Sequence, residues 1–230
     1  MPRIAKSESG GSTTADRTLA LLGAFQTGDS ELPLAVLAKR TGLYKSTSLR
    51  LLASLQQAGF LRRGKNGLYS LGPQITRLHA IRASQSLLER LALPILDGLV
   101  RATEETAALH VVSGSGRIRL CWVDSPRSVR EHIQLGEVLP LDKGAGGKVL
   151  MAFAGVRGRG MNKIRREGFA SSVGERVAEL SGISAPVFDA SGGLVGALTL
   201  TMPVHRYAEK WRGPVVQAAH ELTAELGGDS

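Results

Sequence analysis

Two sets of residues in this sequence have the chemistry to bind negatively charged partners. One gathers basic and hydroxyl side chains between positions 45 and 65. The other is the stretch KGAGGKVLMAFAG at residues 143–155, in which glycines precede an apolar, helix-like run. Backbone N–H groups at a helix N-terminus attract carboxylates, and glycine lets a ligand approach closely. We therefore expect phosphate contacts at the first set and a small anion at the second.

The first set falls among three predicted helices. The apolar spacing indicates a helix from about residue 14 to Gly28, a short one over residues 33–40 and a third over residues 44–57. Gly42 can adopt the left-handed conformation that ends the second helix. The inner face of the third helix is expected to hold Ser48, Leu51, Leu52 and Leu55. Its opposite face is then polar and basic.

A hairpin is predicted directly after these helices. Residues 60–63 and 68–71 alternate in polarity and are joined across Asn66-Gly67, the strongest short hairpin signal. Three helices, a tight turn and a hairpin form a winged helix-turn-helix, whose last helix presents its N-terminal residues to base edges in the major groove of DNA. The candidate DNA-binding residues are Arg17, Lys45, Ser46, Thr47, Leu49, Arg50, Arg62, Arg63 and Lys65.

Each side-chain type suggests a role in that interface. Arg50 can bond guanine, Ser46 and Thr47 a base or a phosphate, and Lys45 a phosphate. The three cations of the hairpin would meet backbone phosphate. Leu49 can make only apolar contact, for example with a thymine methyl group. The alternative is a small helical domain with a solvated basic face.

The remaining two thirds of the chain predict an α+β domain. Residues 73–91 form a connecting helix that begins at Pro73, and Pro94 is expected to begin another helix. Alternating residues then indicate antiparallel strands, and Pro214 opens a final amphipathic helix. The expected strands cover residues 107–111, 118–122, 133–135, 183–188 and 194–202.

Charge separates the two parts of the chain. The 230 residues carry a formal charge of +9; residues 1–79 hold 11 basic and 4 acidic residues, whereas residues 80–230 hold 18 and 16. The N-terminal third therefore carries most of the attraction for a polyanion. Cys121 is the single cysteine, which suits a reducing cytoplasm. No apolar run is long enough to span a membrane, and residues 1–13 are typical of a disordered arm.

The sequence carries no pattern typical of catalysis, a metal or a cofactor. The run GAGGKV lacks the Ser or Thr that follows lysine in a phosphate-binding loop, and no G-x-S-x-G occurs. The five histidines have no metal-ligand spacing. Cys121 lies in an alternating strand and is expected to be buried and inert. We therefore expect neither an enzyme nor a cofactor.

Six segments in order resemble the IclR family of bacterial transcriptional regulators. They are DRTLALLGAF, LAKRTGLYKSTSLRLLASLQQAGFL, YSLG, LPLDKGAGGKVLMAF, IRREGFA and ISAPVFDASGGLVGALTLTMP. The resemblance implies a winged helix-turn-helix over residues 14–73, a linker helix over 74–93 and a GAF-like α+β effector-binding domain over 94–230. It also implies a homodimer or tetramer and an effector that is a small organic acid or an aromatic metabolite.

The resemblance also implies a ligand site. Matched by motif, the family's carboxylate-binding positions fall at Ala145, Gly146 and Gly147, and its pocket-lining positions at Ser172, Leu180 and Gly182. Thr199 and Thr201 alternate onto one face of the late hairpin, where their hydroxyls can donate hydrogen bonds. The segment between residues 153 and 164 is shorter than is usual in the family, so a sensor domain without a ligand is an alternative.

Together these features predict a cytoplasmic, ligand-responsive regulator that binds an operator in double-stranded DNA and has no membrane partner. Two other classes fit the same residues. One is an architectural nucleic-acid-binding dimer without an effector. The other is an enzyme whose helical N-terminal part docks a partner.

Overall fold

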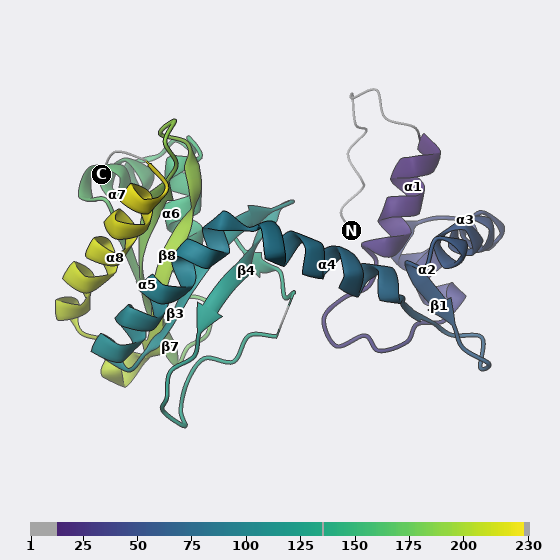
Figure 1. Cartoon of the computed structure of the whole chain (residues 1–230), viewed down its shortest axis with the longest axis horizontal. Helices are drawn as coiled ribbons and strands as arrows, with labels where there is room; N and C mark the ends of the chain where they lie inside the picture. Colours follow the sequence, from purple (N-terminus) through teal and green to yellow (C-terminus); the bar gives the residue numbers. More distant parts are fainter. Residues whose placement is uncertain (1–12, 135, 228–230) are drawn as a thin grey trace. The chain divides into compact units, whose positions relative to one another are not determined.

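The computed structural model describes residues 13–134 and 136–227, which form two compact units, Met1–Gln85 and Ser86–Ser230. Figure 1 shows the helical first unit and the sheet of the second. The division falls inside the predicted linker of residues 74–93. The predicted arm, residues 1–13, lies outside the described residues except for Thr13. None of the helices described is long and apolar enough to cross a membrane.

The first unit has the predicted order of helices and strands. It contains α1 (Thr13–Leu22), α2 (Leu34–Thr41), α3 (Lys45–Gln57), β1 (Leu61–Arg63), β2 (Tyr69–Leu71) and α4 (Pro73–Gln85). Gly42 has φ +68° and ends α2 as expected. The predicted winged helix-turn-helix is therefore confirmed as the fold of this unit.

One boundary in this unit differs from the prediction. Helix α1 ends at Leu22 and does not extend to Gly28. The carboxylate of Asp29 accepts a hydrogen bond from the Gln26 N–H and pairs with Arg40. These bonds hold residues 26–29 in a turn, so the helical pattern stops early.

The core of the first unit lies under α3. Ser48 and Leu52 are fully buried, and Leu51 and Leu55 nearly so, as the helical spacing predicts. Tyr69 of β2 is 1% exposed and bridges to Leu32. Packing on one face of α3 leaves its other face to solvent.

The start of the second unit corrects the predicted role of Pro94. Pro94 lies inside α5 (Leu87–Thr103) and does not begin a helix. The N-cap of this helix is Ser86, whose hydroxyl accepts a hydrogen bond from the Glu89 N–H at 3.3 Å. An internal proline costs about 3 kcal/mol. Burial of Ile95 and Leu96 on the same helix opposes that cost.

The second unit is built on one antiparallel sheet. Its strand order is β5-β4-β3-β8-β7-β6. The strands are β3 (Thr106–Ser113), β4 (Gly116–Val123), β5 (Leu139–Pro140), β6 (Ala170–Val173), β7 (Leu180–Phe188) and β8 (Leu194–Pro203). Edge strands β5 and β6 were not predicted. The strand expected over residues 133–135 is wrong at Ile133 and Gln134, and Leu135 lies outside the described residues.

Helices cover the two faces of this sheet (Figure 1). Helices α5 and α8 (Arg212–Glu225) pack on one face, where apolar strand residues and Cys121 form the main core. Helix α8 begins two residues before Pro214. Helix α6 (Ala145–Phe153) covers the other face, and α7 (Arg159–Glu167), which starts within the short segment, packs on α6. Two 3₁₀ turns, Val204–Arg206 and Glu209–Trp211, precede α8.

Alternation along β8 sorts its side chains between these faces. Leu198, Leu200 and Met202 belong to the core under α5 and α8. Thr199 and Thr201 alternate with them and therefore face α6. The same sheet thus has an apolar face and a face with buried polar groups.

Candidate functional site

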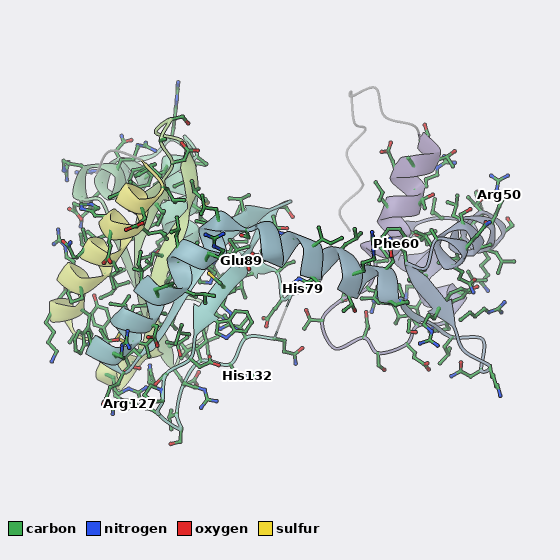
Figure 2. The ribbon with its side chains drawn as sticks, in the orientation of Figure 1. Arg50, Phe60, His79, Glu89, Arg127 and His132 are labelled. Atoms are coloured by element: carbon green, nitrogen blue, oxygen red, sulfur yellow. The ribbon has the colours of Figure 1, made fainter. Side chains whose placement is uncertain are left out.

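The exposed face of α3 carries most of the residues predicted to bind DNA. Lys45, Ser46, Leu49 and Arg50 are exposed, and Thr47 is half-buried. In Figure 2 the side chain of Arg50 points away from its domain. This face therefore presents cations and hydroxyl groups to a partner.

The hairpin adds three more exposed cations. Arg62, Arg63 and Lys65 lie on or beside the turn between β1 and β2. The turn is braced by Asn66, which accepts a hydrogen bond from the Leu68 N–H and donates one to Glu31 at 3.0 Å. These hydrogen bonds fix the conformation of the turn that carries the cations.

Few of these cations have a protein partner. Among the described residues, Lys45, Arg50, Arg62 and Lys65 form no ion pair. Arg63 lies 5.5 Å from the centre of the Tyr69 ring. Buried or paired cations would be structural, whereas exposed cations without carboxylate neighbours are available to phosphate.

Two further exposed residues lie outside α3 and the hairpin. Arg17 is exposed on α1, as expected for a contact residue. Tyr44, directly before α3, is 84% exposed and was not predicted. The sequence could have indicated this residue. Tyr44 is an aromatic residue at the start of the predicted third helix, directly before the candidate contact residues Lys45 and Ser46.

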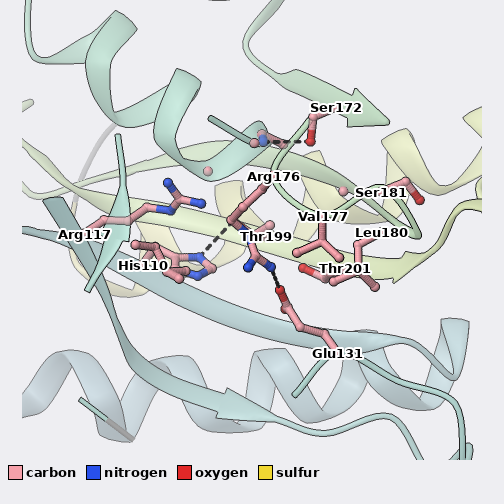
Figure 3. A pocket seen from close by; sticks show the side chains of 15 residues that line it. His110, Arg117, Glu131, Ser172, Arg176, Val177, Leu180, Ser181, Thr199 and Thr201 are labelled. Atoms are coloured by element: carbon pink, nitrogen blue, oxygen red, sulfur yellow. Dashed lines mark hydrogen bonds and ion pairs between the residues drawn. The ribbon is translucent and has the colours of Figure 1, made fainter. Parts of the chain in front are cut away.

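In the second unit, the N-terminus of α6 borders a polar pocket of about 40 Å³ (Figure 3). Seven of the eight residues predicted for the ligand site line it: Ala145, Gly146, Ser172, Leu180, Gly182, Thr199 and Thr201. Gly147 does not. A Cβ atom there would lie 2.2 Å from the Leu141 carbonyl oxygen, so Gly147 serves close packing under the helix.

The first turn of α6 lies close to β8. A Cβ atom on Gly146 would lie 2.9 Å from Oγ1 of Thr199, so only glycine fits without a shift. The Ala145 N–H donates to Oγ of Ser172 at 2.9 Å. The N–H groups of a helix's first turn have no acceptor within the helix. The Gly144 N–H donates to the carboxylate of Glu175 at 3.4 Å. The N–H groups of this turn that have no protein acceptor, together with the hydroxyls, can therefore hold an anion.

A buried histidine adjoins the same hydroxyl groups. Nδ1 of His110 lies 3.2 Å from Oγ1 of Thr199, which is 2.9 Å from Oγ of Ser184. Nε2 of His110 is buried and has no hydrogen-bond partner among the described residues. Burial, reinforced by nearby arginines, lowers the pKa of His110 to about 3. The ring is therefore neutral at physiological pH.

Two arginines and a glutamate complete the polar lining. Nη1 of Arg117 donates to the carbonyl oxygens of Pro140 and, at 3.0 Å, of Lys143, while its buried Nε has no partner among the described residues. Burial lowers the pKa of Arg117 to about 10. Arg176 pairs with Glu131, and burial raises the pKa of that carboxyl group.

Sequence reasoning missed these ionisable residues. His110, Arg117, Glu131 and Arg176 come from four separate segments, and only the fold brings them together. A signal was present near the predicted strands. His110 interrupts the apolar pattern of residues 107–111, and Arg117 directly precedes residues 118–122, where a polar residue on a buried face needs a reason. No group of His, Cys, Asp and Glu in the described part of the chain is placed to hold a metal ion.

Models of two domains from one known protein family match both parts of this chain. The model of the IclR helix-turn-helix domain matches residues 14–65, and that of the bacterial transcriptional regulator IclR C-terminal domain matches residues 81–157 and 158–226. The chain belongs to the IclR family of bacterial transcriptional regulators. Members of this family regulate transcription and are not enzymes, so the expectation of a non-enzymatic function is confirmed.

Individual IclR proteins are similar over nearly the whole chain. The glycerol operon regulatory protein of Streptomyces coelicolor is 28% identical, over 93% of this chain and 94% of its own length. A solved IclR regulator from a Silicibacter species has a TM-score of 0.83 at 26% identity, covering 94% and 96% of the two chains. An IclR homologue from Microbacterium hydrocarbonoxydans, solved with 4-hydroxybenzoate, has a TM-score of 0.78 at 22% identity, covering 93% and 99%.

Proposed function

We propose that this IclR regulator binds an operator through α3 and the β1–β2 hairpin and responds to a small anionic metabolite held in the pocket beside α6. The observation that carries the proposal is the contrast in charge placement. Cations without carboxylate partners cover an exposed face of the first unit, whereas guanidinium groups and hydroxyls, most of them buried, line a pocket in the second.

The DNA roles follow from side-chain chemistry. Arg50 is assigned to a base edge, Ser46 and Thr47 to a base or a phosphate, and Leu49 to apolar contact. Lys45 and Arg17 join the hairpin cations Arg62, Arg63 and Lys65 as phosphate contacts. We add Tyr44 because its exposed ring lies beside the first turn of α3.

The ligand role follows from the pocket. The first turn of α6, with Gly146, is assigned to a carboxylate, supported by Thr199 and Thr201. A relative's complex with 4-hydroxybenzoate, itself a small organic acid, supports this ligand class. The small volume and polar lining favour a compact, polar acid over a large aromatic one.

We further propose a cytoplasmic homodimer or tetramer in which ligand binding alters operator affinity through α4. Leu78 of α4 is 42% exposed and Leu87 of α5 is 53% exposed, which suits contact with a second copy. Coupling between two sites is reciprocal, so operator DNA must change ligand affinity by the same factor.

The test is recovery of fragmented genomic DNA by the purified protein, followed by sequencing. A regulator is expected to retain one or a few sharp sites containing a pseudo-palindrome. Broad retention that disappears at modest salt would contradict the proposal and favour an architectural DNA-binding protein without an effector, whose affinity comes from phosphate contacts. The small pocket volume is the observation in favour of that second candidate.

A further inference from the structure

The carboxylate of Glu131 occupies one end of the pocket. Glu131 lies in the segment between β4 and β5, is 5% exposed and pairs with Arg176 (Figure 3). The Thr201 hydroxyl and Arg176 both act to keep this carboxyl group ionised against the effect of burial on its pKa. Glu131 therefore already uses an arginine and a hydroxyl group that line the candidate ligand site.

The other end of the pocket offers donors to a second anion. The first turn of α6 lies there with Thr199 and Arg117. Arg117 is 3% exposed and His110 is 2% exposed, and each has a buried nitrogen, Nε and Nε2 respectively, without a partner among the described residues. Buried nitrogen atoms of this kind are normally hydrogen-bonded, so their state points to a ligand.

The charges of the lining do not balance. Arg117 and Arg176 contribute two positive charges, His110 is neutral, and Glu131 contributes the single negative charge. A ligand with one acidic group would balance the lining while Glu131 stays. A ligand with two acidic groups would balance both guanidinium groups once Glu131 leaves.

We propose that the pocket has two anion subsites and binds a small dianion, such as a short dicarboxylate, whose second acidic group replaces Glu131 at Arg176 and Thr201. The first acidic group lies at the α6 N-terminus, beside Thr199 and Arg117. This inference rests on the proposed function, because it takes the pocket to be the effector site.

The spacing of the subsites agrees with a short ligand. Thr199 and Thr201 are two residues apart on β8, which corresponds to roughly 7 Å. A short carbon chain spans that distance between its terminal oxygens. Glu131 acts as an internal competitor, so a ligand with one acidic group gains less from the second subsite than a dianion does.

Isothermal titration of the full chain with succinate and butyrate tests the proposal, because the two acids share a four-carbon chain and differ in one carboxylate. Succinate is expected to bind at least about tenfold more tightly, because its second carboxylate can form charge-assisted hydrogen bonds that butyrate lacks. Glu131→Gln should tighten succinate further by removing the competing charge.

Two variants show whether Arg176 is the second subsite. Arg176→Gln should bring the two affinities together. The double variant Arg176→Gln with Glu131→Gln should do the same without leaving a buried carboxylate unpaired, which protects the test if the single variant unfolds. The matched control is Glu105→Gln, which changes another buried glutamate paired with arginine, Arg206, and should preserve the preference.

Three results would overturn the proposal: equal binding of succinate and butyrate, a preference that survives in the double variant, or weaker succinate binding by Glu131→Gln. If both acids bind equally and alter operator binding, the effector site stands and only the dianion proposal fails. If neither acid binds, the effector part of the proposed function fails as well, while the genomic DNA test still decides the DNA part.

Discussion

The two units of this regulator place their charges in opposite ways. On α3 and the β1–β2 hairpin, Arg50 and Lys65 are exposed and have no carboxylate partner among the described residues. Around the sheet of the second unit, Glu105 and Glu131 are almost fully buried and each is paired with an arginine. Exposed charges can serve a partner at little cost to folding, whereas buried charges are part of the fold.

The comparison predicts different outcomes for the same type of substitution. Removing an arginine from the first unit should change DNA binding and leave stability intact. Removing an arginine from a buried ion pair of the second unit should mainly lower the free energy of unfolding.

The largest effect is expected for Arg206→Ala. The guanidinium group of Arg206 contacts Glu105 through two hydrogen bonds, at 2.5 and 2.8 Å, and Glu105 is 3% exposed. Removing the arginine leaves a buried carboxylate without its partner, which costs about 3–5 kcal/mol. Urea unfolding at pH 7, followed by circular dichroism, measures the loss.

The control is Arg127→Ala, which breaks the exposed pair with Glu104. Exposed pairs contribute about 0–1 kcal/mol. If both variants lose the same free energy of unfolding, burial does not distinguish the two ion pairs. The contrast between buried and exposed charges would then be wrong for the second unit.

Arg50→Ala should have the next largest effect, on DNA. We expect a loss of about 1–3 kcal/mol on an operator fragment and a relaxed sequence preference, because Arg50 is assigned to a base edge. Its unfolding midpoint should stay unchanged. Fluorescence anisotropy with operator and scrambled DNA measures both affinities, and Arg101→Ala, an exposed arginine of the second unit, is the control. Equal losses on both DNAs would assign Arg50 to phosphate.

The same contrast explains what the sequence could predict. Local signals defined the first unit: the αL glycine Gly42, the leucines of α3 and the Asn66-Gly67 turn each act within a few residues. The end of α1 was missed because the ion pair between Asp29 and Arg40 joins the loop after α1 to helix α2. Propensity cannot anticipate such a contact.

The pocket was predictable only in its local parts. Gly146 and Thr199 were found because a glycine turn before a helix and alternation on a strand are local patterns. Arg176 and Glu131 are 45 residues apart in sequence and meet only after the sheet has formed. The short strands β5 and β6 were missed for the same reason, because their pairing partners fix them and their own residues do not.

Lowering the pH should change the contribution of His110 to the free energy of unfolding in a way that distinguishes it from the other buried groups. Its pKa in the folded protein, about 3, lies below the ordinary 6.5, so unfolding takes up a proton between these values. The stability due to the neutral ring is complete above pH 6.5 and falls by up to about 1.4 kcal/mol per pH unit below it. Urea unfolding at pH 7 and pH 5 should show a smaller acid loss in His110→Gln than in the unmodified protein.

Titration of Glu131 should change the stability with pH in the opposite direction, so Glu131→Gln is the control for His110→Gln. Burial raises the pKa of its carboxyl group, so its protonation opposes the acid loss as the pH falls. Glu131→Gln should therefore steepen the acid loss, whereas His110→Gln reduces it. Identical slopes in all three proteins would mean that neither group titrates with folding.

The smallest effect is expected for Lys65→Ala. Lys65 lies in the turn between β1 and β2, is exposed, and is assigned to a phosphate. Its loss should weaken binding about equally on operator and scrambled DNA and reduce the slope of log affinity against log salt by about 1, since one fewer counterion is released. Anisotropy titrations at several salt concentrations measure the slope. Lys163→Ala, on the surface of α7, should leave it unchanged. An unchanged slope in Lys65→Ala would place the hairpin away from DNA, and the exposed charges of the first unit would then act through α3 alone.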